Sequence, residues 1–241
     1  MSIQYNFKDK VVVVIGAGSG IGKKTAEMFC QAGARTVSVS REGSQTLTDG
    51  LAVKCDISDE EQVKGMVDEV VKRFGTIDIL VNCAAVNQPG KIEDISLKDW
   101  EYVLGVNLTG QFLCCKYVVP IMKQKKYGKI VNISSIAGRL RSTLSGIHYV
   151  TSKAAVIGFT RQLAYELAPD KINVNAICPG QTDTPMLRAS LKPGDEEKLK
   201  QIIPLGKPAS PEQQANVILF LVSDEADYIT GSIIDVNGGQ L

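Results

Sequence analysis

The two side chains best suited to acid–base chemistry in this sequence are a tyrosine and a lysine four residues apart. They are Tyr149 and Lys153, within "SGIHYVTSKAAVIGF". If this stretch is a helix, the two lie on one face, where the ammonium would favour the phenolate and lower the tyrosine pKa. Work near neutral pH asks for a drop of about three units, or roughly 4 kcal/mol. The spacing alone is common by chance, so the rest of the chain must supply the context.

A glycine-rich loop lies between the first apolar run and a helical pattern. In "VVVVIGAGSGIG" the glycines allow a tight turn and let backbone N–H groups approach a pyrophosphate, which the helix dipole also attracts. This context predicts a dinucleotide cofactor. The residues expected to hold it are Gly16, Gly18, Ser19, Gly20, Ile21 and Gly22.

The end of the second strand bears on which nicotinamide cofactor is bound. An acidic residue there binds ribose hydroxyls, whereas an arginine accommodates a 2′-phosphate. The strand ends in "VSVSREGS", so Ser40 occupies the place of the acid and Arg41 follows it. Both can donate hydrogen bonds to a phosphate that a carboxylate would repel. The sequence therefore favours NADP(H), with NAD(H) as the alternative.

The elements that must position these residues alternate along the chain. Strands are expected at 10–16, 34–40, 51–56, 76–84, 128–135, 171–180 and 231–239, and helices at 20–33, 58–75, 96–126, 148–168 and 210–224. We expect Ser58 and Ser210 to be helix N-caps and Pro120 to bend the long helix. This order predicts an α/β fold. It would be a single-domain, Rossmann-type, doubly wound parallel sheet of about seven strands with helices on both faces, spanning residues 1–241.

Residues 181–210 form the least regular part of the sequence. They follow the carboxyl end of an expected strand, where open α/β sheets bind ligands. We expect a mobile flap over the substrate, with a plain exposed loop as the alternative.

Composition and charge exclude several classes of protein. The formal net charge of +1 gives no electrostatic footprint for nucleic acid or an anionic membrane. No apolar run is long enough to span a membrane, and the N-terminus has no signal-peptide pattern, so we expect a cytoplasmic protein. With one histidine and no C-x-x-C pair, no metal site is expected, and the six cysteines are interpreted as reduced and mostly buried.

Taken together, these motifs resemble the short-chain dehydrogenase/reductase family over essentially the whole chain. Their order and spacing carry the resemblance. The matching stretches are the glycine loop at 16–22, "CD" at 55–56, "NCAA" at 82–85, "VN" at 106–107, "ISS" at 133–135, Tyr149 with Lys153, "PGQTDT" at 179–184 and "NGG" near the end.

The resemblance implies a catalytic tetrad. Tyr149 would be the general acid/base with Lys153 as its partner, Ser135 would bind the substrate carbonyl, and Asn107 would hold a water that links Lys153 to solvent. Asp56 and Ile57 would flank the adenine, and Thr184 would contact the nicotinamide carboxamide or the phosphates. Further cofactor contacts are expected from Asn82, Ala84, Pro179, Gly180 and Thr182, and substrate contacts from Ser135, Leu144, Tyr149 and Met186.

The sequence departs from the family pattern at four places. Ile15 replaces the usual threonine before the glycine loop, and Cys83 and Ala85 change the usual "NNAG" to "NCAA". Ser135 lies fourteen positions before Tyr149, one more than the commonest spacing, which leaves Ser134 as an alternative. The helix usually found between Arg41 and the next strand is absent or reduced to a turn. His148, beside Tyr149, is expected near the helix start or in the pocket wall.

The leading hypothesis is an NADP(H)-dependent oxidoreductase that interconverts a ketone and a secondary alcohol, and the resemblance leaves the substrate open. A basic cluster near the site mouth would suit an acyl-carrier substrate, polar walls would suit a sugar or polyol, and apolar walls would suit a ketone or steroid. The candidates are, in turn, Lys123, Lys125, Lys126 and Lys129; Arg139, Arg141, Ser142, Thr143 and Ser145; and Leu140, Leu144, Met186 and Leu187.

Two further expectations concern alternatives and assembly. A non-catalytic cofactor-sensing protein on the same fold is a competing function, but all four tetrad positions are filled. The partner would be a small carbonyl or alcohol substrate. The resemblance also implies a homotetramer, or a homodimer, packed through the helices at 96–126 and 148–168 and near the last strand.

Overall fold

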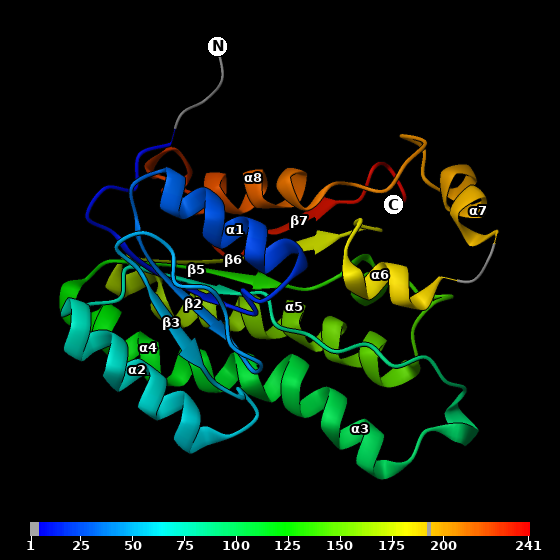
Figure 1. Cartoon of the computed structure of the whole chain (residues 1–241), viewed down its shortest axis with the longest axis horizontal. Helices are drawn as coiled ribbons and strands as arrows, with labels where there is room; N and C mark the ends of the chain where they lie inside the picture. The colour runs from blue at the N-terminus through cyan, green and yellow to red at the C-terminus, as the bar shows by residue number, and fades with distance from the viewer. Residues whose placement is uncertain (1–4, 192–193) are drawn as a thin grey trace.

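A parallel sheet runs through the centre of the molecule (Figure 1). The computed structural model describes residues 5–191 and 194–241. Within them the sheet has seven strands in the order β3-β2-β1-β4-β5-β6-β7, all parallel, so the expected fold class is confirmed. The strands are β1 Val11–Ile15, β2 Arg35–Ser40, β3 Leu51–Lys54, β4 Ile79–Asn82, β5 Gly128–Ile133, β6 Ile172–Pro179 and β7 Ile233–Val236.

Helices cover both faces of the sheet (Figure 1). Helices α1 and α8 lie on one face, and α2, α4 and α5 lie on the other. A π-helix joins α3 to α4. The bounds are α1 Gly20–Gln31, α2 Glu60–Phe74, α3 Leu97–Leu104, the π-helix Gly105–Thr109, α4 Gly110–Lys125, α5 Ile147–Leu167, α6 Pro185–Ser190, α7 Asp195–Ile202 and α8 Pro211–Val222.

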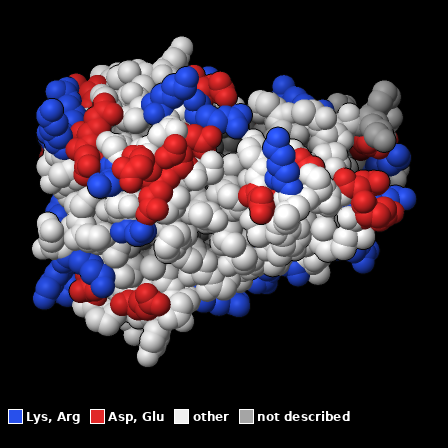
Figure 2. Space-filling model, turned by 90° about the horizontal axis from the view of Figure 1, so that it is seen from below, with Lys and Arg blue, Asp and Glu red and all other residues white. Residues whose placement is uncertain are grey.

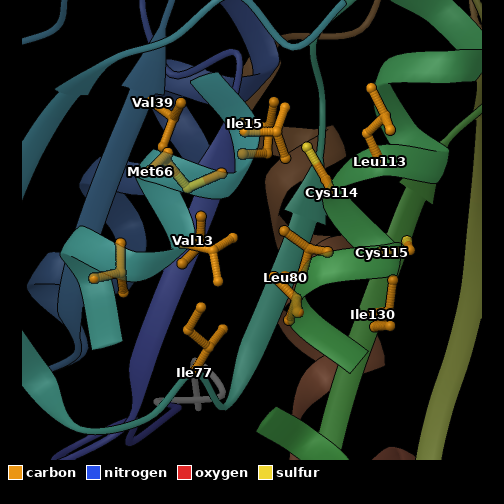
Figure 3. Packing of buried hydrophobic residues seen from close by; sticks show 14 of the residues in the cluster. Val13, Ile15, Val39, Met66, Ile77, Leu80, Leu113, Cys114, Cys115 and Ile130 are labelled. Atoms are coloured by element: carbon orange, nitrogen blue, oxygen red, sulfur yellow. The ribbon is translucent and has the colours of Figure 1, made fainter. Parts of the chain in front are cut away.

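Alternation along β1 divides the core into two layers. Successive side chains of a strand point to opposite faces, so Val13 and Ile15 join Met66 of α2 in one cluster, seen in Figure 3. Val12 and Val14 join α1 and α8 in the other. Because both faces are buried, β1 is apolar throughout, and this is why its sequence is a continuous run of β-branched residues.

The chain reverses its direction of winding at β1. From β1 it runs outward to β2 and β3, and then returns to place β4 on the other side of β1. The carboxyl ends of β1 and β4 therefore border the topological switch point, where doubly wound sheets bind ligands.

Some local expectations differ from the structure. The N-cap of α2 is Asp59, not Ser58, because Asp59 Oδ1 accepts from the backbone N–H groups of Glu61 and Gln62 at 3.0 and 3.1 Å. Ser210 does cap α8, and Gln213 completes a capping box. The segment 181–210 contains α6 and α7 rather than only loop. Residues 41–50 contain turns and no helix, as expected.

No helix in the described parts of the chain combines the length and the apolar character needed to cross a lipid bilayer.

Candidate active site

A cavity opens at the switch point, along the carboxyl edge of the sheet. It has a volume of about 1150 Å³ and is lined by the glycine loop, the ends of six strands, the loop before α5, and α6. The sequence-predicted residues that line it are Gly16, Gly18, Ser19, Gly20, Ile21, Gly22, Ser40, Arg41, Asp56, Ile57, Ala84, Ser135, Leu144, Tyr149, Lys153, Pro179, Gly180, Thr182, Thr184 and Met186. Asn82 and Asn107 do not line the cavity but lie next to residues that do.

The glycine loop has no room for side chains where it crosses β4. Gly16 has φ +84°, and a Cβ there would lie 2.6 Å from the backbone nitrogen of Ala84. A Cβ on Gly22 would lie 2.2 Å from the carbonyl oxygen of Gly16. These glycines bring the start of α1 close to the cavity wall, so its free N–H groups and positive dipole border the cavity. The loop and the cavity volume fit a bound dinucleotide.

Side chains at the end of β2 line one end of the cavity, the end that would face the adenine of a bound dinucleotide. Arg41 donates to the Tyr102 hydroxyl at 3.0 Å through Nη1, and to Glu42 at 3.0 Å through Nε. Ser44 donates to the hydroxyl of Ser40 at 2.9 Å. The guanidinium is thus held at the cavity edge, but it already has a carboxylate partner.

Helix α5 places Tyr149 and Lys153 on one face, with the ammonium 5.8 Å from the centre of the phenol ring. Lys153 Nζ donates to the carbonyl oxygen of Ile133 at 2.8 Å, and the side chain is 1% exposed. Burial lowers the pKa of Lys153 to about 8, although the nearby thiols of Cys83 and Cys178 act in the opposite direction. Burial also raises the pKa of Cys83 to about 12, so this thiol stays neutral beside the lysine.

The expected lowering of the Tyr149 pKa is wrong for the site as it stands. Burial raises the pKa of Tyr149, and hydrogen bonding with the Ser135 side chain only partly offsets the rise. The physical reason is desolvation, which penalises the phenolate and is not visible in a sequence spacing. Tyr149 is therefore a protonated phenol at neutral pH, which is the form that can donate a proton.

The two serines of "ISS" have different surroundings. Ser134 Oγ donates to the backbone carbonyl of Lys153 at 2.7 Å and is buried. Ser135 Oγ accepts from the backbone N–H of Ala137 at 3.1 Å and neighbours Tyr149 across the cavity. The loop at 139–146 absorbs the extra residue, so the geometry favours Ser135 for contact with a substrate oxygen.

Asn107 sits in the π-helix, a feature that often marks functional sites. Its Oδ1 accepts from the backbone N–H of Val86 at 2.8 Å, and its Nδ2 donates to the carbonyl of Val86 at 3.0 Å and to Ser152 Oγ at 3.1 Å. Asn107 thereby fixes the chain after β4 against α5. Asn82 is fully buried in β4 and donates to Asn132 Oδ1 at 2.9 Å, so it braces the sheet beside the cavity.

Two expectations about the surroundings need correction. The lysines of the expected basic cluster do not line the cavity. Lys125, at the end of α4, pairs with Asp78, and Lys129, at the amino end of β5, pairs with Asp227. His148 packs against Gly146 at the start of α5 and is 1% exposed. The expected position near the helix start is confirmed. The expected place in the pocket wall is wrong, because His148 does not line the cavity.

Sequence reasoning missed several lining residues. Gln181, Ser190, Ile202 and Gln240 also face the cavity. Gln240 comes from the C-terminal end of the described chain, which folds back so that its Oε1 lies 2.6 Å from the place that a Cβ on Gly180 would take. The position of the "NGG" motif just before it was the only signal for this approach.

Comparisons with known proteins agree with this geometry. A family model described as enoyl-(acyl carrier protein) reductase matches residues 16–240. The 3-oxoacyl-[acyl-carrier-protein] reductase FabG of Thermotoga maritima is 40% identical over 240 residues, which cover 95% of this chain and 97% of that protein.

Two solved structures are similar at 34% identity and a TM-score of 0.90. One is a 3-ketoacyl-(acyl-carrier-protein) reductase from Brucella melitensis complexed with NADH, with 97% of this chain and 98% of that chain covered. The other is the aldohexose dehydrogenase of Thermoplasma acidophilum, with 97% of this chain and 94% of that chain covered. With this sheet, this glycine loop and these relatives, the chain belongs to the short-chain dehydrogenase/reductase family of oxidoreductases and is similar to its 3-oxoacyl-acyl-carrier-protein reductases.

Proposed function

We propose that this protein is an NADP(H)-dependent oxidoreductase that interconverts a ketone and a secondary alcohol by hydride transfer. The observation that carries the proposal is the meeting of Tyr149, Lys153 and Ser135 in the same cavity as the glycine loop. A bound nicotinamide dinucleotide would supply or accept the hydride. The glycine loop and the start of α1 would hold its pyrophosphate.

The side chains of the chain would handle the proton. In the reducing direction, Tyr149 donates its hydroxyl proton to the carbonyl oxygen, and Ser135 donates a hydrogen bond to the same oxygen as negative charge develops on it. Lys153 lies on the same helix face and stabilises the phenolate that results. Asn107 positions the strand end behind them through Val86. The raised pKa of Tyr149 keeps its hydroxyl protonated until the proton is transferred.

The preference for NADP(H) rests on Ser40 and Arg41. Neither is acidic, and both line the cavity at the end of β2. Glu42 competes for the Arg41 guanidinium, so a 2′-phosphate would have to displace or share this contact. Titration of the protein with NADPH and NADH, in the wild type and in Arg41→Ser, tests the preference. We expect tighter NADPH binding that Arg41→Ser reduces to the level of NADH.

The substrate class follows less directly. The relatives include reductases of 3-oxoacyl-[acyl-carrier-protein] and an aldohexose dehydrogenase at similar identity. NADP(H)-linked reduction of a 3-oxoacyl thioester is the first reaction to test, followed by sugars, diketones and ketosteroids.

The decisive experiment compares the wild type with Tyr149→Phe. We expect NADPH oxidation with at least one ketone class, a fall in turnover of about 10²–10⁴-fold in the variant, and unchanged NADPH binding. Tight NADPH binding without turnover of any ketone would instead support the non-catalytic, cofactor-sensing alternative.

A further inference from the structure

One guanidinium in the substrate half of the cavity has no counter-ion. Arg141 is exposed and lines the cavity, and it has no hydrogen-bond or ion-pair partner among the described residues. Two other arginines, neither of which lines the cavity, differ in this respect. Arg139 pairs with Asp235 at 3.0 Å, and Arg188 pairs with Asp183 at 2.7 Å.

The carboxylates that line the cavity are far along the fold from Arg141. They are Glu42 and Asp56, which follow β2 and β3 on the adenine side. In the part formed by residues 134–153 and by the described residues after β6, the lining contains no acidic side chain. Glu93 and Asp94 line a second hollow of about 740 Å³, which shares residues 142–145 with the cavity but does not include Arg141. The charged groups of the substrate half are therefore both cationic, Arg141 and Lys153.

The walls around Arg141 are suited to a partly desolvated ligand. Apolar side chains and hydroxyls alternate there, which strengthens a charged hydrogen bond relative to one in open water. A guanidinium presents a planar fork that matches carboxylate or phosphate oxygens. The residues that share this part of the wall are Leu140, Ser142, Thr143, Leu144, Met186 and Ile202.

We propose that Arg141 is a specificity-determining residue that binds an anionic group, a carboxylate or a phosphate, carried by the substrate itself away from the reacting carbonyl. The inference rests on the proposed function, because it assigns the substrate class of the same cavity. It separates this chain from a reductase of neutral ketones or steroids. It also predicts an anion preference that acts on substrate binding and weakens as salt concentration rises.

The test uses matched pairs of ketones that differ only in charge. The carboxylate arm compares 3-oxobutanoate, 4-oxopentanoate and 5-oxohexanoate with their methyl esters, and the series varies the reach from carbonyl to anion. The phosphate arm compares dihydroxyacetone phosphate with dihydroxyacetone. We expect kcat/KM to favour the anionic member of at least one arm by about 10- to 100-fold, mainly through KM. The arm that shows the preference identifies the anion.

Two variants separate a specific contact from general charge. Arg141→Gln should remove the preference by raising KM for the anionic member of each pair. Arg139→Gln removes a positive charge two residues away, and should keep the preference. Equal kcat/KM within every pair, or a preference that persists in Arg141→Gln, would overturn the inference while leaving the proposed function intact.

A binding measurement keeps the two proposals distinguishable when no ketone is turned over. Calorimetry with 4-oxopentanoate and with dihydroxyacetone phosphate is run on the protein saturated with NADP⁺. Binding that Arg141→Gln weakens would support the anion site even though the proposed reaction had failed. No binding of either probe, together with no turnover, would overturn both.

Discussion

Lys153 is the most heavily desolvated charge in the candidate site. Its ammonium donates to the Ile133 carbonyl, but no carboxylate among the described residues pairs with it. Burial lowers its pKa from 10.5 to about 8. Keeping such a buried group charged lowers the free energy of unfolding. A contribution to stability therefore does not explain a lysine at this position.

This cost predicts a pH dependence of stability. Between pH about 8 and 10.5 the unfolded chain holds the Lys153 proton and the folded protein releases it, so the free energy of unfolding rises with pH in this window. Relative to Lys153→Met, which lacks this titration, the wild type should gain about 2 kcal/mol between pH about 7 and about 9.5. Urea unfolding of both proteins at the two pH values measures the difference. An equal change in the free energy of unfolding in both proteins would show that the pKa of Lys153 is the same in the folded and the unfolded chain.

At the scale of single elements, the start of α2 distinguishes two neighbouring cap candidates. Asp59 receives two backbone N–H groups, whereas the hydroxyl of Ser58 donates to Asp56. Asp59→Ala should therefore lower Tm by about 2–4 °C, and Ser58→Ala should lower it less. Thermal unfolding of both variants is the measurement, with Ser58→Ala as the matched control. A larger fall in Tm for Ser58→Ala than for Asp59→Ala would show that Ser58 is the N-cap.

A second element, the π-helix, predicts the effect of a single-atom change. Asn107→Asp replaces a donating amide by an oxygen. This oxygen faces the Val86 carbonyl and the Ser152 hydroxyl, which both accept from the amide and of which the hydroxyl already donates to the Tyr149 carbonyl. We expect a loss of about 1–3 kcal/mol in the free energy of unfolding and a lower kcat. Asn216→Asp, on the exposed side of α8, makes the same chemical change and should have little effect on either. Urea unfolding and steady-state turnover compare the two.

The elements of the fold differ in how well the sequence predicts them. The β-branched run of β1 and the capping box at Ser210 are local signals, and both elements appear where expected. The choice between Ser58 and Asp59 depends on which side chain turns toward the helix, and both types are good caps. The π-helix leaves the apolar pattern of 96–126 almost unchanged, so periodicity predicted one helix there. Helices α6 and α7 are too short to show a clear period.

At the scale of the whole molecule, contacts between distant segments decided what the sequence could and could not reveal. The order of the motifs predicted the cavity lining, because the carboxyl ends of parallel strands meet at one edge. The prediction that Lys125 and Lys129 lie near the cavity mouth was wrong, because they lie at the opposite end of the strands from the cavity. Burial of Tyr149 reversed the expected pKa direction. Gln240 reaches the cavity only through the fold of the C-terminal segment.

Assembly is the remaining property at this scale, and we propose a homotetramer, with a homodimer as the alternative. Large apolar side chains are exposed on the helices expected to pack together: Phe112 of α4 is 46% exposed and Tyr165 of α5 is 80% exposed. Figure 2 shows charged side chains of both signs at both ends of the face seen from below, with a mostly uncharged stretch between them. Uncharged, partly apolar surface of this kind is typical of subunit contacts.

Light scattering coupled to size exclusion tests this proposal. We expect a mass four times the 26.0 kDa of the chain. Tyr165→Glu should lower it, because a carboxylate introduced into an apolar contact loses its hydration without gaining a partner. Ile92→Glu makes a similar change at a side chain that is 70% exposed but lies in the short 3₁₀ turn Ile92–Asp94 before α3, so its mass should equal that of the wild type. A monomeric wild type, or a mass that Tyr165→Glu leaves unchanged, would contradict assembly through α5.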